Sequence, residues 1–110
     1  MIGGNVTATI QIQTVTKNEI AEAVPTWLTV QTLLGWLDLM SGNAKIEAYS
    51  AKIQESTHIF IGDYVALNSQ ITSENSRMLV NGKVYQITLI DNPMELNRQW
   101  EIYLKYTGGV

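Results

Sequence analysis

Residues 78–93 read MLVNGKVYQITLIDNP, and the dipeptide Asn81-Gly82 stands between two apolar runs. Asparagine followed by glycine is the strongest short hairpin signal, because both residues tolerate the positive φ angles of a type I′ turn. After the turn, apolar side chains expected on one face alternate with polar ones expected on the other: Tyr85, Ile87 and Leu89 against Gln86 and Thr88. Residues 91–93, Asp-Asn-Pro, end this strand, because proline cannot donate to a β-ladder and asparagine favours turns.

Residues 100–106 read WEIYLKY and alternate strictly between apolar and polar positions. The expected inner side chains are Trp100, Ile102, Leu104 and Tyr106, and the expected outer ones are Glu101, Tyr103 and Lys105. A period of two indicates a strand with one buried face and one face that meets water or a partner. Residues 78–106 therefore predict a three-stranded antiparallel meander.

Length and composition favour a single soluble domain over residues 1–110, with flexible ends at residues 1–4 and 107–110. The chain has no cysteine, so neither a disulfide nor a thiolate metal site can form. No apolar run approaches the roughly 18 residues of a membrane span. The net charge is −3 and the seven basic residues are scattered, which argues against tight binding of duplex DNA.

The first half of the chain predicts two strands. Residues 6–13 alternate between apolar and polar side chains, and residues 17–25 form a polar connector in which residues 18–23 could make a helical turn. Residues 26–40 form the longest β-type run, whose apolar positions change parity at Gly35. This change suggests a bulge at Gly35 within one long bent strand, and two separate strands joined near Gly35 are the alternative.

The middle of the chain predicts one helix. Residues 44–54 are rich in alanine, with apolar side chains at helical spacing. Residues 57–61 then predict a strand, which residues 64–67 could continue past a bulge, and residues 68–76 form a polar loop. The fold class expected from this order is mainly β: a small antiparallel β-barrel or sandwich with one inserted short α-helix.

The residues do not favour an enzyme, and they point to no cofactor or metal. The single histidine, His58, lies within a predicted strand and is expected to be structural or exposed at the surface. Asp63, Asp91 and Glu101 could meet in space, but ten acidic residues make such a meeting an ordinary coincidence. No histidine metal motif and no phosphate-binding glycine loop occurs.

The aromatic residues have two interpretations. Large side chains are needed to fill a small barrel, so a core position is expected for Trp27, Trp36, Trp100 and Tyr106. Tyr103 lies on the polar face of its strand and is a candidate contact residue, with an ordinary exposed tyrosine as the alternative. Tyrosines on strands also stack on single-stranded bases, although that mode favours neighbouring basic residues.

Five segments, taken in order, resemble the head closure (head-tail joining, or stopper) proteins of tailed bacteriophages. They are residues 35–42 (GWLDLMSG), 56–59 (STHI), 82–87 (GKVYQI), 91–93 (DNP) and 100–106 (WEIYLKY). The resemblance extends from Val6 to Gly109 and rests on the order and spacing of segments that are individually common. Members of the family often carry basic residues around the strand that here contains His58.

The resemblance implies a structural virion protein of the phage neck, made in the host cytoplasm and not associated with a membrane. Such proteins form a ring below the portal and adaptor proteins after packaging, close the DNA channel, and offer a surface to the tail proteins. A dodecamer is expected in the virion, with a monomer as the alternative in solution, and genomic DNA would pass without sequence-specific binding. The alternatives are a tail-terminator or tail-tube ring protein and a barrel that binds single-stranded nucleic acid.

The resemblance also implies where the channel and the subunit contacts lie. The insert at residues 41–57 matches the channel-facing stopper segment of the family, whereas the residues alone fit a barrel cap or a presented interaction element equally well. The candidate channel residues are Ser41, Gly42, Asn43, Lys45, Glu47, Lys52 and Glu55. Tyr103 and His58 are the candidate residues of the subunit interface.

Overall fold

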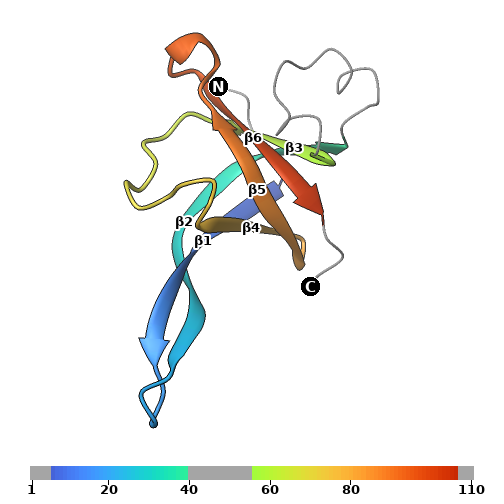
Figure 1. Ribbon diagram of the computed structural model, residues 1–110. Helices are drawn as coiled ribbons and strands as arrows, with labels where there is room; N and C mark the ends of the chain where they lie inside the picture. The colour runs from blue at the N-terminus through green and yellow to red at the C-terminus, as the bar shows by residue number, and fades with distance from the viewer. Residues whose placement is uncertain (1–5, 40–55, 107–110) are drawn as a thin grey trace.

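The computed structural model describes residues 6–39 and 56–106, which form one closed antiparallel β-barrel (Figure 1). Its elements are β1 (Val6–Lys17), β2 (Ala23–Leu39), β3 (His58–Asp63), β4 (Ser76–Val80), β5 (Lys83–Asp91), the 3₁₀ turn η1 (Pro93–Glu95) and β6 (Gln99–Tyr106). Neighbouring strands follow the order β1-β2-β3-β6-β5-β4, and β4 pairs with β1 to close the sheet. The predicted mainly antiparallel β fold is confirmed, whereas the predicted helix and both chain ends lie outside the described residues.

The C-terminal meander has the predicted form. Asn81 and Gly82 have φ angles of 53° and 76°, so both occupy the left-handed region that a type I′ turn requires. Val80 and Lys83 pair directly across this turn. Strand β5 ends at Asp91, immediately before the turn that contains Pro93. The local sequence therefore sets both ends of β5.

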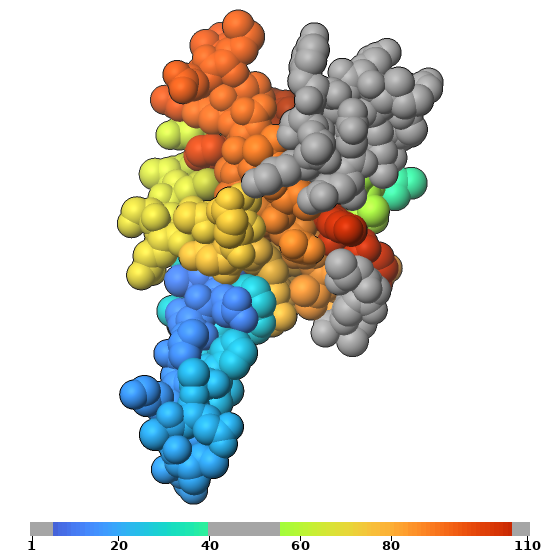
Figure 2. Space-filling model, in the orientation of Figure 1, coloured from blue at the N-terminus to red at the C-terminus, as the bar shows by residue number. Residues whose placement is uncertain are grey.

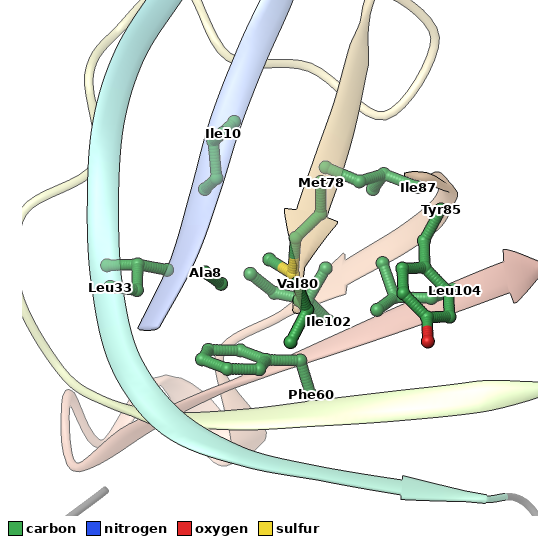
Figure 3. Close-up of a cluster of buried hydrophobic side chains, with 10 residues drawn as sticks. All are labelled: Ala8, Ile10, Leu33, Phe60, Met78, Val80, Tyr85, Ile87, Ile102 and Leu104. Atoms are coloured by element: carbon green, nitrogen blue, oxygen red, sulfur yellow. The ribbon is translucent and has the colours of Figure 1, made fainter. Parts of the chain in front are cut away.

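The barrel interior is filled by side chains from all six strands of the described chain (Figure 3). Strands β1 and β6 contribute the alternating residues that the sequence pattern places inside, among them Ile10 and Ile102, which are fully buried. The complete cluster consists of Ala8, Ile10, Leu33, Phe60, Met78, Val80, Tyr85, Ile87, Ile102 and Leu104.

The bulge in β2 lies at Val30, and the prediction of a bulge at Gly35 is wrong. Ile10 of β1 pairs with Gln31, while Gln11 pairs with Thr29, which leaves Val30 without a partner on β1. One extra residue reverses the face of every side chain that follows. Leu33 consequently points into the core, and its neighbour Leu34 is exposed.

Two of the four aromatic residues predicted for the core lie at the surface. Trp27 and Trp36 are exposed, because the β2 register directs them away from the barrel interior. The Arg77 guanidinium lies 4.2 Å from the centre of a Trp27 ring. Trp100 and Tyr106 are partly buried and pack against the core, as expected.

Strand β5 contains a second bulge, which corrects the predicted orientation of Thr88. Ile87 pairs with Leu104 and Leu89 pairs with Tyr103, so Thr88 is the extra residue. Thr88 is buried and donates a hydrogen bond to the Tyr103 carbonyl oxygen at 3.0 Å. The Ser56 hydroxyl lies 2.6 Å from Thr88 Oγ1, so the buried hydroxyl has polar partners.

Two connections also differ from the predictions. Residues 18–22 form a tight turn between β1 and β2, and the predicted helical turn is absent there. Residues 64–67 form no strand and belong to the connection between β3 and β4. Within that connection, Leu67 and Ile71 pack against the core cluster, which anchors the loop to the barrel.

Gly35 allows β2 and β3 to approach each other under the ring of Phe60. A Cβ atom at Gly35 would clash with the Ile61 carbonyl oxygen and would lie 2.7 Å from Phe60 Cζ. Backbone atoms cannot move aside as a flexible side-chain end can. Gly35 therefore has a packing role, and the bulge assigned to it from sequence lies elsewhere.

We expect G35A to lower the free energy of unfolding by about 1–3 kcal/mol, the usual cost of overpacking a core. A decrease in stability would point to the clash, because replacing glycine by alanine within an unstrained strand normally raises the free energy of unfolding by roughly 0.5–1 kcal/mol. Urea unfolding followed by tryptophan fluorescence measures the difference. An increase in stability would contradict the close approach at Gly35.

Candidate interaction surfaces

The predicted channel segment lies outside the described residues. Its members Ser41, Gly42, Asn43, Lys45, Glu47, Lys52 and Glu55 all fall within residues 40–55. The two predicted interface residues, His58 and Tyr103, are both described. The β3–β6 register pairs His58 with Leu104 and Ile59 with Tyr103. Directly paired residues share a face, so His58 and Tyr103 lie on opposite faces of the sheet and are not brought together.

His58 lies on the inner face at one end of the barrel, among aromatic rings. Its ring centre is 5.1 Å from that of Tyr85 and 6.4 Å from that of Tyr106, in edge-to-face geometry. Thr57 Oγ1 accepts the Tyr106 N–H at 2.8 Å and lies 2.8 Å from His58 Nδ1. The Thr57 hydroxyl can therefore donate to a neutral imidazole. Burial, and secondly the positive charge of Lys83, lower the pKa of His58 below its usual 6.5.

We expect the wild-type protein to lose stability relative to H58N as the pH falls through 6.5. The lowered pKa means that the unfolded chain takes up the proton first, so acid favours the unfolded state. Asparagine does not titrate and retains an acceptor for the Thr57 hydroxyl. Urea midpoints of both proteins between pH 7.5 and 5.5 measure the difference, and parallel curves would count against a partly buried histidine that stays neutral in the folded state.

Tyr103 lies on the outer face of β6, where it is half-buried beside acidic groups. Its hydroxyl lies 3.4 Å from Glu101 Oε1, and the other carboxylate oxygen of Glu101 accepts a hydrogen bond from Gln99 at 2.8 Å. Burial raises the pKa of Tyr103, and the negative charges of Glu101 and Asp91 raise it further. Tyr103 therefore remains a neutral hydrogen-bonding group at physiological pH.

The outer face around Tyr103 is more apolar than the sequence pattern of β6 suggests. Register places Ile59 of β3 and Leu89 of β5 on either side of Tyr103. The exposed Trp36 pairs with Ile61 in the adjacent row. An apolar band thus crosses the outer surface of β2, β3, β6 and β5, with the Tyr103 side chain within it. The same two rows also contain the carboxylates of Asp38, Glu101 and Asp91.

The first two strands extend beyond the barrel as a two-stranded arm, residues 14–26, which projects from the molecule (Figures 1 and 2). The pairing of β1 with β4 ends at Ile12, followed by one further hydrogen bond from Gln13 N to Asn75 O. Beyond this point β1 and β2 pair with each other, and none of residues 14–26 is buried. The connector predicted for residues 17–25 consists of the ends of β1 and β2 and the turn between them, so the prediction gave no sign of this surface.

The tip of the arm has a defined conformation. Asn18 Oδ1 accepts hydrogen bonds from the backbone N–H groups of Ile20 at 3.1 Å and Glu22 at 2.9 Å. The Ala21 N–H donates to the Asn18 carbonyl oxygen at 3.0 Å, and Ala21 occupies the left-handed region with φ 62°. The turn holds Ile20 at the apex, where 73% of the residue is exposed. Glu19 and Glu22 lie on either side of it.

The described residues contain neither a cluster of three metal-ligating side chains nor a helix long and apolar enough to span a bilayer. The described surface presents an apolar band, an arm with an apolar tip, and neighbouring carboxylates.

The chain resembles a solved structure in its fold. No protein-family model and no curated protein matches the chain. The solution structure of protein SF1141 from Shigella flexneri 2a is similar, with a TM-score of 0.72 and 22% sequence identity. The likeness covers 98% of this chain and 96% of that chain. At this identity it establishes a shared fold and nothing about function.

Proposed function

We propose that this chain is a structural subunit of the head-tail connector of a tailed bacteriophage. In this role it closes the DNA channel below the portal and adaptor proteins and provides a docking surface for the tail. The observation that carries the proposal is the arm. A projecting ribbon with an ordered tip and an exposed isoleucine is a feature of a subunit built for assembly. The resemblance of five sequence segments to head closure proteins is the reason for proposing the phage connector as that assembly.

The energetics of the arm support assembly. A two-stranded ribbon without further packing is marginally stable in water, since it has no core. The exposed Val15 and Ile20 side chains gain little from folding while the chain is alone. Full burial against a partner is worth about 1.5–3 kcal/mol for each such side chain. Contact with a neighbouring subunit would stabilise both the arm and the assembly.

The charge of the chain is compatible with a channel through which DNA moves. Its net charge is −3, and a ring of such subunits would repel phosphate groups. Tight binding needs lysine and arginine side chains that displace counterions from the nucleic acid. An acidic ring would let packaged DNA pass without adhering. The assignment of residues 41–57 as the channel-facing segment belongs to this same proposal.

Deletion of this gene from the parent phage is expected to give heads that have lost their DNA beside complete free tails in electron micrographs. The physical reason is that an unclosed channel cannot retain pressurised DNA and offers no surface for the tail. Normal heads bearing tails of uncontrolled length would assign the chain to tail termination instead. Intact infectious particles would overturn the proposal.

Binding of single-stranded nucleic acid is the competing interpretation, because the exposed Trp27 and Trp36 are aromatic surfaces of the kind that stack on bases. Arg77 already lies over Trp27, at 4.2 Å, and the net charge opposes the approach of phosphate. We expect no saturable binding of a fluorescent oligothymidylate at low salt, measured by anisotropy. Salt-dependent binding that W36A abolishes would favour this alternative.

A further inference from the structure

A large hollow lies on the barrel near the ends of β1 and β2 that are remote from the arm tip. Its volume is about 990 Å³, comparable to sites that accommodate drug-sized molecules. Its lining combines the apolar side chains of Leu34 and Val65 with the charged side chains of Asp63 and Arg98. Leu34 is 58% exposed and Val65 is 45% exposed, so the hollow presents apolar surface to the outside.

One wall of the hollow is held in place by hydrogen bonds and stacking. Trp100 Nε1 donates to the Val65 carbonyl oxygen at 2.8 Å, and the Trp100 ring stacks on Tyr64 with centres 5.3 Å apart. Gln31 donates to the Ala66 carbonyl oxygen at 3.0 Å and accepts the Asn68 N–H at 2.8 Å. The loop after β3 is therefore fixed before any partner arrives.

The neighbouring loop of the lining is braced in a similar way. Asn92 Nδ2 donates to Asn97 Oδ1 at 2.8 Å, and the Asn97 N–H donates to Asn92 Oδ1 at 3.2 Å. This pair closes the loop between β5 and β6 and positions Arg98, whose exposed side chain lines the hollow. A surface that is ordered in advance loses little conformational freedom on binding.

The arm tip and the hollow carry groups that can pair. The tip presents the apolar Ile20 between two acidic residues, Glu19 and Glu22. The hollow presents apolar surface at Leu34 and Val65 beside the exposed positive charge of Arg98. The lining also contains Asp63, which is partly buried and already interacts with another group of the chain. The tip and the hollow are both ordered by hydrogen bonds within the free chain, the tip through Asn18 and the hollow through its two braced loops.

The arm cannot reach the hollow of its own chain. The pair Thr7–Leu34 lies at the hollow, and the pair Lys17–Ala23 lies at the base of the tip. Ten strand positions separate Thr7 from Lys17, which places the two regions roughly 33 Å apart at the rise of a β-strand. The arm leads away from the barrel along this direction (Figure 1).

We propose that the hollow receives the arm tip of a second copy of this chain. Ile20 of one copy packs against Leu34 and Val65 of the next, and its flanking carboxylates pair with Arg98. The contact joins two different surfaces, so repetition produces a ring when the rotation closes and a filament when it does not. The inference rests on the proposed self-association and specifies the contact that would build it.

Disulfide exchange between two variants tests the contact directly, because the chain has no native cysteine. I20C is first converted to its mixed disulfide with 2-thiopyridine, and reduced V65C is then added. The Val65→Cys thiolate attacks the Ile20→Cys sulfur, a protein–protein disulfide forms, and pyridine-2-thione leaves. Absorbance of the released thione gives the rate. L39C is the matched control, since Leu39 is 75% exposed and does not line the hollow.

We expect V65C to react at least about tenfold faster than L39C, because a bound pair reacts at an effective concentration in the millimolar range. Each rate is divided by the rate of the same thiol with a small pyridyl disulfide. Equal normalised rates would overturn the proposal. Reduced I20C reacting with activated I20C faster than V65C does would place arm against arm and would also overturn it.

Charge reversal provides a second readout. R98E in the V65C chain is expected to lower the exchange rate by roughly two- to fivefold, the range of an exposed ion pair. E19K together with E22K in the activated chain should restore it. If neither change altered the rate, the proposed pairing of Arg98 with Glu19 and Glu22 would be overturned.

The outcomes separate this inference from the proposed function. Fast exchange at V65C together with an unaffected deletion phage would leave the arm contact standing and remove the connector role. Equal exchange rates together with DNA-emptied heads would overturn the arm contact and leave the connector role standing. The two proposals can therefore fail independently.

Discussion

The pairing of β1 with β4 is the constraint on which the rest of the structure depends, because it joins the N-terminal hairpin to the C-terminal meander and closes the sheet. The register is set by Ala8 and Ile10, which are fully buried opposite Val80 and Met78. A slip by one residue would turn all four side chains to the other face. Closure also fixes the narrow interior in which Phe60 can pack over Gly35.

The same pairing explains the arm. Strand β4 runs only from Ser76 to Val80, so β1 loses this partner after Ile12 while its pairing with β2 continues to Lys17. Hydrogen bonds within the ribbon hold it together beyond that point, including one between Thr14 and Thr26 at 2.8 Å. Without a core, the ribbon depends on local hydrogen bonds and on whatever it contacts.

Much of the fold could be predicted from the sequence where local chemistry decides the conformation. Asn81-Gly82 determines a turn by itself, and strict alternation identifies the inner face of β6. The orientation of Leu33 and Trp36 could not be predicted in this way. A bulge is defined by the partner strand, and the unpaired residue at Val30 becomes visible only when β1 is aligned against β2.

The candidate surfaces also depend on strand pairing, which the sequence pattern of one strand does not reveal. Tyr103 could be assigned to an outer face from alternation alone, but its apolar neighbours come from β3 and β5 through register. His58 belongs to a strand that alternates too briefly to reveal which face it occupies. One sequence feature does indicate the arm: the run of β-type residues in β2 is far longer than the usual five or six residues of a strand.

An ordered arm tip and an ordered hollow suit the contact proposed between identical subunits. The tip is fixed by Asn18 and the hollow by Trp100 and Asn92, so the matching surfaces are ordered in advance. The ribbon that connects each tip to its own barrel consists of two strands with no third partner, and such ribbons are more strongly twisted than wider sheets. A heterologous contact closes into a ring only at particular rotations. The twist of the ribbon sets the direction in which the tip leaves its barrel, and so it would set the rotation between neighbouring copies in the proposed contact.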